Sequence, residues 1–272
     1  MSKSTDKMTK LVYIGGYGHS GSTLLEYLMT ANPEVIACGE IVNARRDWQK
    51  TRKCSCGQSA ESCPVWGPLF DKSIKADRRN HTGLVLTLLQ QLADRYAIIV
   101  DSSKTAWTHA VAPFKLRRKL DQNFLLVHIL RDPRAVCWSI IKRSKRVGQR
   151  RNAILLSVAG ASGWTVANLA CELFGWFYPA QYHRIRYENL VCSCPDVLES
   201  LFRKIPSKKS LCFNHMATNQ NRHQLFGNRL RSQKLSLENI SEDAAWRTKM
   251  PSPHRRLARV FSWGLCNRYG YF

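Results

Sequence analysis

The sequence predicts an α/β fold, in which a parallel sheet carries helices on both faces. Three apolar runs of strand length support this prediction, at residues 11–17, 97–100 and 124–130. Each run is continuously apolar, as in strands that are buried on both faces, and the first and third lead into segments with helical features. A chain of 272 residues with 44% apolar residues is long enough for one sizeable core, so we expect a single domain over residues 1–272.

The elements follow in order along the first half of the chain. The first run enters a Gly/Ser-rich turn, and residues 22–29 then form a helical pattern. The third run ends at Arg131, and Pro133 is typical of the first position of a helix. Residues 43–80 are rich in charge, cysteine, glycine and proline, so we expect an inserted lid or subdomain there, followed by a helix over residues 84–95.

The second half contains the most apolar long stretch, residues 154–180. Asn168, Glu172 and several glycines interrupt this stretch, which favours a buried helix over a transmembrane segment. A strand is predicted at residues 182–187. The polar residues 214–236 are expected to form a loop.

The chain is strongly basic. Lysine and arginine number 42 against 19 aspartates and glutamates, which gives a formal charge of +23. Such a surface attracts anions, whether an anionic ligand, a nucleic acid or an acidic membrane. The N-terminal sequence MSKSTDKMTK lacks the apolar core of a secretory signal, and we therefore expect a soluble, cytoplasmic protein.

Three of the ten cysteines lie close together in the sequence, at Cys54, Cys56 and Cys63. A chain of this size does not need a disulfide framework, so we expect most of the cysteines to be reduced. The three clustered thiols would hold zinc if a fourth ligand came from elsewhere in the chain. The alternatives are an ordinary loop that carries thiols or a local disulfide.

The loop Gly18-His19-Ser20-Gly21-Ser22-Thr23 follows the first predicted strand and precedes a helix. At this position a parallel sheet usually binds its ligand, and an anion would meet free backbone N–H groups and the positive end of the helix dipole. The lysine of the nucleotide triphosphatase pattern G-x-x-x-x-G-K-[ST] is missing, because Ser22 follows Gly21. The loop is suited to a phosphosulfate, although Gly/Ser clusters also form plain turns.

A second motif is Arg131-Asp132-Pro133-Arg134, with Ser139 eight residues beyond Arg131. If a helix begins at Pro133, Ser139 lies within its first two turns and faces the same pocket as Arg131. The guanidinium and the hydroxyl would then share one phosphate. The alternative for an isolated Arg-Asp-Pro is a salt bridge at the start of a helix.

Taken together, these motifs resemble the superfamily of sulfotransferases that use 3′-phosphoadenosine 5′-phosphosulfate (PAPS). The resemblance continues through Val100-Asp101-Ser102-Ser103-Lys104, Arg186-Tyr187-Glu188-Asn189-Leu190, Gly227-Asn228-Arg229-Leu230-Arg231 and Arg268-Tyr269-Gly270-Tyr271. It covers nearly the whole chain and is strongest toward the bacterial, carbohydrate and tyrosylprotein branches. The order of the motifs is more specific than any one of them.

The resemblance implies a P-loop-like fold of sulfotransferase architecture, with PAPS as co-substrate and no metal required for transfer. It also implies the residues that bind the nucleotide. The 5′-phosphosulfate would lie on the loop that begins with Gly18 and His19, held by Ser20, Gly21, Ser22 and Thr23. Arg131 and Ser139 would bind the 3′-phosphate, and Arg231 would close over the nucleotide.

Two departures from the family pattern affect the catalytic residues. His19 stands where the family loop usually carries lysine or arginine, so Lys104, with His19, becomes the candidate that stabilises the leaving group. Ala106 stands where cytosolic members carry a histidine base. By resemblance to the tyrosylprotein branch, Glu40 in Ala37-Cys38-Gly39-Glu40 is the candidate base, and His109 is the alternative.

The sequence therefore predicts transfer of a sulfuryl group from PAPS to a hydroxyl or amine of an unidentified acceptor. The positive charge favours an anionic carbohydrate, a glycolipid or an acidic peptide as acceptor. The alternative functions are a P-loop-type nucleotide kinase and a basic nucleic-acid-binding protein. Nucleic acid is the less favoured partner, because no recognised nucleic-acid-binding module accompanies the basic runs.

Overall fold

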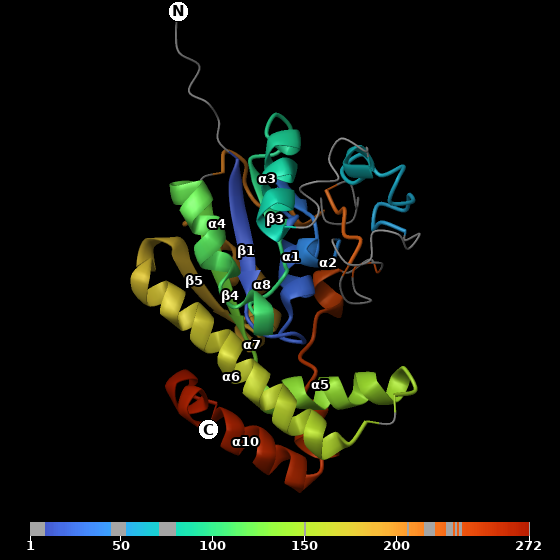
Figure 1. Ribbon diagram of the computed structural model, residues 1–272, viewed down its shortest axis with the longest axis vertical. Coiled ribbons are helices and arrows are strands. Elements are labelled where there is room, and N and C mark those ends of the chain that lie inside the picture. Colours follow the sequence, from blue (N-terminus) through green and yellow to red (C-terminus); the bar gives the residue numbers. More distant parts are fainter. Residues whose placement is uncertain are drawn as a thin grey trace, which may run out of the picture.

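The computed structural model of the protein is built on one five-stranded parallel sheet (Figure 1). It describes residues 9–44, 53–70, 80–149, 151–205, 207–214, 221–226, 231, 233 and 236–271. The strand order is β2-β3-β1-β4-β5, so β1 lies at the centre. The strands are β1 (Lys10–Gly15), β2 (Val35–Ala37), β3 (Ile98–Asp101), β4 (Phe124–Leu130) and β5 (Tyr182–Arg186).

Helices cover both faces of the sheet, as predicted. Because side chains alternate along a strand, Leu11 and Tyr13 pack with α3, α4 and α6, whereas Val12 and Ile14 pack with α1, α7 and α8 on the opposite face. The helices are α1 (Ser22–Met29), α2 (Ile41–Ala44), α3 (His81–Leu92), α4 (Ala112–Leu120), α5 (Pro133–Arg146), α6 (Ala153–Phe177), α7 (Tyr187–Cys192), α8 (Cys194–Phe202), α9 (Trp246–Lys249) and α10 (Ser252–Tyr269).

Several elements differ from the sequence-based expectation, β2 and α3 among them. The edge strand β2 was not predicted, because it has only three residues. Helix α3 begins at His81 rather than at residue 84 and ends at Leu92 rather than at residue 95. The side chain of Asn80 caps it by accepting a hydrogen bond from the backbone N–H of Thr82, a start signal that precedes the apolar pattern.

The segment that was predicted to be an insertion is described in part, at residues 53–70. It contains an antiparallel bridge between Lys53 and Ser59 and a short 3₁₀ helix, η1 (Gly67–Phe70). Trp66 is fully buried and belongs to the same apolar core as α3 and β1. Residues 45–52 and 71–79 lie outside the described part of the chain, as does most of the predicted loop at 214–236.

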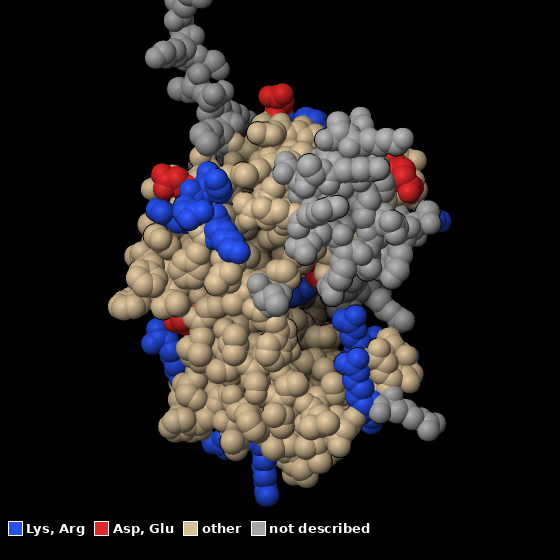
Figure 2. All heavy atoms as spheres, viewed as in Figure 1, with Lys and Arg blue, Asp and Glu red and all other residues tan. Residues whose placement is uncertain are grey.

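Helix α6 is long and apolar enough, by length and composition alone, to cross a membrane. One side of it packs against α5, α10 and the sheet, with Trp164 and Phe174 fully buried. The other side exposes apolar residues, among them Trp176 and Phe177. Figure 2 shows a broad surface over this helix that is largely free of charged side chains. Several lysine and arginine side chains lie together over α5.

The strand order determines which loops meet. The chain leaves β1 toward β2 on one side, and β4 lies on the other side of β1, so the carboxyl ends of β1 and β4 form a topological switch point. The loop after β1 and the residues after β4 therefore lie together. The carboxyl ends of β2 and β3 are neighbours in the same way, which brings the segment before Glu40 close to the segment before Lys104.

Candidate active site

The loop between β1 and α1 has the features of an anion-binding loop. Gly21 has a φ of 94° and precedes α1 without a side-chain cap, which leaves the first N–H groups of the helix available to a ligand. Ser20 is fully buried, and its Oγ atom has no hydrogen-bond partner among the described residues. A buried hydroxyl without a partner is costly, so an anion at this loop would satisfy it.

Arg131, at the end of β4, lies against this loop. Its Nη1 atom donates to the carbonyl oxygen of His19 (3.1 Å), and its Nη2 atom donates to the carbonyl oxygen of Asp243 (3.2 Å). The guanidinium lies 4.2 Å from the centre of the Tyr187 ring, which fixes its plane. The salt bridge that begins α5 is instead made by Asp132 and Arg134 (2.6 Å), so the helix-start alternative does not account for Arg131.

Ser139, within the first two turns of α5, also contacts the loop. Its Oγ atom lies 3.0 Å from Nδ1 of His19, so His19 contacts both residues that were predicted to share a phosphate. Burial, together with the nearby charges of Arg143 and Lys104, lowers the pKa of His19 to about 4. The His19 ring is therefore neutral near pH 7 in the free protein.

Glu40 and Lys104 form an ion pair at the neighbouring strand ends. The Nζ atom of Lys104 donates to Oε1 of Glu40, and Nδ2 of Asn43 donates to Oε2 of Glu40. Lys104 has a φ of 68°, a strained conformation for a residue with a side chain. The hydroxyl of Tyr13 donates to its carbonyl oxygen, which helps to hold this backbone.

Next to this ion pair lies a cavity of about 640 Å³. Its lining includes Val42 and Ala106, each two residues beyond a member of the pair, together with His81 and His109. His109 was a candidate from the sequence, whereas His81 was not. Nε2 of His81 lies 2.8 Å from Oδ2 of the fully buried Asp101, an arrangement that orients an imidazole.

Glu26 is a second buried group that the sequence analysis missed. It is fully buried in α1, and its carboxylate accepts hydrogen bonds from the Gly39 N–H (2.6 Å), the Ser102 hydroxyl (2.8 Å) and the Gln224 amide (2.6 Å). Burial raises the pKa of Glu26 to about 7, although these hydrogen bonds oppose the increase. Glu26 therefore positions the turn that carries Glu40. This role could not be predicted from the sequence, because it depends on the strand order that brings these segments together.

Arg231 was predicted to close over the nucleotide. In the structure its Nη1 atom donates to the carbonyl oxygens of Lys53 (3.0 Å) and Gln224 (3.1 Å). It therefore contacts residues 53–70, the Cys-rich segment, and its role at the nucleotide stays a prediction. Residues 227–230, in the same motif, lie outside the described residues.

The sequence Arg186-Tyr187-Glu188 supports the residues around Arg131. Oε1 of Glu188 accepts from the backbone N–H of Asp132 (3.1 Å), and Oε2 accepts from the Tyr271 hydroxyl (3.0 Å). With the ring of Tyr187 beneath Arg131, this segment holds the end of β4 in place.

A parallel sheet with an anion-binding loop at the end of its central strand places the protein in the P-loop-like α/β fold class. Residues 12–208 match the sulfotransferase family, which is more than half of the chain, and the protein belongs to this family. A comparison with curated proteins gave no match.

Solved structures agree with this assignment at the level of the fold. The chain is similar to the sulfotransferase domain from the curacin biosynthetic pathway, with a TM-score of 0.56 and 19% identity over 93% of this chain and 97% of that one. It is also similar to the sulfotransferase domain from the Synechococcus PCC 7002 olefin synthase, with a TM-score of 0.55 and 18% identity over 96% and 98% of the two chains. A sulfotransferase from Alicyclobacillus acidocaldarius gives a TM-score of 0.50 and 10% identity over 94% and 92%.

Proposed function

We propose that the protein transfers the sulfuryl group of PAPS to a hydroxyl or amine of an acceptor and releases adenosine 3′,5′-bisphosphate. The observation that carries this proposal is the convergence of three groups on one loop. The buried hydroxyl of Ser20, which has no partner within the described part of the chain, the guanidinium of Arg131 and the hydroxyl of Ser139 all lie on or against the loop between β1 and α1. Family membership favours this reaction over phosphoryl transfer by a kinase and over nucleic-acid binding.

The loop and the N-terminus of α1 would hold the 5′-phosphosulfate. The N–H groups there point at a bound anion, and the helix dipole favours negative charge. Arg131 and Ser139 would hold the 3′-phosphate, for which a guanidinium in a fixed plane is suited. No metal is required for these contacts.

Lys104 and Glu40 would act at the sulfur. The sulfuryl group forms a bond to the acceptor oxygen or nitrogen as its bond to the bridging oxygen of PAPS breaks, and the electron pair of that bond leaves with the bisphosphate. Lys104 would stabilise the charge that develops on the departing oxygen. Glu40 would accept the acceptor's proton, and His81 or His109 is the alternative base because both line the adjoining cavity.

The cavity of about 640 Å³ is the proposed acceptor site. It opens beside the Glu40–Lys104 pair and also has Trp107 and Lys115 in its lining, an aromatic ring and a cation. This composition favours an acceptor that combines an apolar or sugar ring with a negative charge, such as an anionic carbohydrate, a glycolipid or an acidic peptide. We also propose a cytoplasmic location, which is supported by ten free thiols.

Calorimetric titration with adenosine 3′,5′-bisphosphate, with ADP as the control ligand, tests the donor site. We expect selective binding of the bisphosphate. Arg131→Ala should weaken it at least about tenfold, because charge-assisted hydrogen bonds to the 3′-phosphate are lost. Equal binding of ADP, or unchanged affinity in the variant, would contradict the proposal. A screen of acceptors with ³⁵S-labelled PAPS then tests transfer directly.

A further inference from the structure

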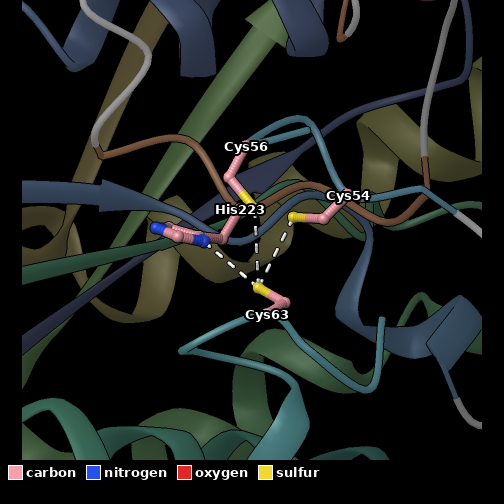
Figure 3. A group of neighbouring side chains, drawn as sticks. All are labelled: Cys54, Cys56, Cys63 and His223. Atoms are coloured by element: carbon pink, nitrogen blue, oxygen red, sulfur yellow. Dashed lines mark hydrogen bonds between the residues drawn. The ribbon is translucent and has the colours of Figure 1, made fainter. Parts of the chain in front are cut away.

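Three cysteines and one histidine form a compact cluster that the proposed transfer reaction does not use. Cys54, Cys56 and Cys63 come from the segment 53–70, and His223 comes from a segment 160 residues further along the chain (Figure 3). The four donor atoms all lie within 4.8 Å of one another. Figure 3 shows the three sulfur atoms and a ring nitrogen of His223 directed toward a common point.

The distances within the cluster are those of a tetrahedral zinc site. Zn–S bonds of about 2.3 Å and Zn–N bonds of about 2.0–2.1 Å place tetrahedral sulfur ligands roughly 3.8 Å apart and sulfur and nitrogen ligands roughly 3.5 Å apart. Sγ of Cys63 lies 3.6 Å from Sγ of Cys54, 3.9 Å from Sγ of Cys56 and 3.2 Å from Nδ1 of His223. These three distances are therefore compatible with ligands around one zinc ion.

We propose that Cys54, Cys56, Cys63 and His223 bind one structural Zn²⁺ ion. A set of three thiolates and one imidazole is among the standard structural zinc sites, and soft sulfur ligands in a tetrahedron select zinc over magnesium or calcium. Four protein ligands leave no position for a substrate, which separates this ion from the transfer chemistry. On binding, the three thiols release their protons to solvent and no ligand is oxidised or reduced.

The alternatives that were open from the sequence fit these contacts less well. A disulfide between two of the cysteines would not involve the third, and all three cysteines are free thiols. A plain loop would not require His223, which is buried, to point its Nδ1 atom at Cys63. His223 is the fourth ligand, which could not be identified from the sequence and which the fold brings next to the three cysteines.

The ion would connect a segment with little regular structure to the sheet. His223 donates its backbone N–H to the carbonyl oxygen of Ala37 (2.8 Å), the last residue of β2. The hydroxyl of Ser55 donates to the carbonyl oxygen of Arg222 (2.8 Å), and the amide of Gln224 donates to Glu26. Zinc would thus hold the Cys-rich segment on the edge of the sheet that leads to Glu40.

This arrangement predicts which parts of the protein depend on the metal. Residues 53–70 and 221–226 would loosen without zinc, because the ion would link the three cysteines of the first segment to His223 of the second. The β1–α1 loop and α5 follow the inner strands β1 and β4, whereas the cluster lies at the edge strand β2. Binding of adenosine 3′,5′-bisphosphate would therefore persist in the zinc-free protein, and the zinc site does not depend on the proposed function.

The test is metal analysis of the full chain, purified under reducing conditions without chelator, together with titration of Co²⁺ into the stripped protein. We expect about one zinc per chain, and thiolate-to-cobalt charge-transfer bands with the visible spectrum of tetrahedral Co²⁺. Cys56→Ser is the main variant, because this side chain is partly exposed and its loss should least disturb folding. It should weaken metal binding at least about a hundredfold, more than the loss of an outer partner does.

Cys192→Ser is the matched control, because Cys192 is an exposed free thiol outside the cluster. It should bind metal as the wild type does. Hydrogen exchange before and after zinc removal adds a readout that does not need a variant, and increased exchange should be confined to residues 53–70 and 221–226. The proposal is overturned if the reduced wild type binds no Zn²⁺, if iron is the bound metal, if both variants lose metal equally, or if a disulfide within the cluster is found instead.

Discussion

Oγ of Ser139 lies 3.0 Å from Nδ1 of His19, across 120 residues of sequence. The contact joins the first helical turns after β4 to the loop after β1, and Arg131 contacts the same histidine through its carbonyl oxygen. By the family resemblance, a cation is expected where His19 stands. Its protonation therefore decides whether the site gains another positive charge when a nucleotide binds.

We expect His19 to take up a proton when adenosine 3′,5′-bisphosphate binds. Burial and nearby cations lower the pKa of His19 to about 4 in the free protein, and phosphate charges beside it would raise that pKa again. Affinity should then increase as the pH falls from 7 toward 5.5. His19→Asn, which tolerates the φ of 67° at this position, should weaken this dependence. Calorimetry in buffers of different ionisation enthalpy measures the proton uptake, and equal uptake in both proteins would contradict the prediction.

Glu40→Gln should lower the rate of transfer without weakening the binding of the nucleotide. The amide cannot accept the acceptor's proton, and loss of a general base costs typically about 10²–10⁴ in rate. Single-turnover transfer from ³⁵S-labelled PAPS to an acceptor from the screen measures this loss. His81→Asn is the comparison, since His81 lines the same cavity. A larger loss in His81→Asn than in Glu40→Gln would assign the base to the histidine.

Glu26→Gln should make stability less dependent on pH. Burial raises the pKa of Glu26 to about 7, so the folded state retains a proton that the unfolded state releases above its ordinary pKa of 4.5. The carboxyl therefore destabilises the fold progressively as pH rises from 4.5 to 7, by on the order of 3 kcal/mol in total. The amide does not ionise, and its variant should lose less stability over this range. Urea unfolding at pH 5 and pH 8 measures the difference, and parallel pH profiles would contradict it.

Much of the fold follows from local sequence, because a central parallel strand must be apolar on both faces. The runs at β1, β3 and β4 and the helix at α1 are predictable for this reason. The motif order also placed Arg131 and Ser139 beside the loop. The pairing of Glu40 with Lys104 is harder to predict from the sequence, because β2 has only three residues and no strand pattern identifies this strand.

The remaining parts of the site depend on contacts between distant segments. His81 lies before the apolar pattern of α3, and only the register of the sheet brings it to Asp101. Glu26 occupies a helical position that sequence alone assigns to solvent, yet Gly39, Ser102 and Gln224 surround it. His223 stands in a polar stretch with no metal-binding spacing of its own. No local pattern marks these residues, since each acquires its role from a partner elsewhere in the chain.

Gly21→Ala should weaken nucleotide binding more than about tenfold and lower stability. Its φ of 94° suits glycine, and an added Cβ would lie 2.5 Å from Cδ2 of Tyr187, whose ring lies beneath Arg131. The backbone strain alone costs about 1–2 kcal/mol, and displacing Tyr187 would move the guanidinium from the 3′-phosphate site. Gly264→Ala is the control, because Gly264 lies in α10 with no atom within 4 Å of an added Cβ, and alanine should stabilise that helix. Calorimetry with adenosine 3′,5′-bisphosphate and thermal unfolding measure both effects. If Gly21→Ala lost stability but kept full affinity, the loop would be a structural turn and the phosphosulfate would have to bind elsewhere.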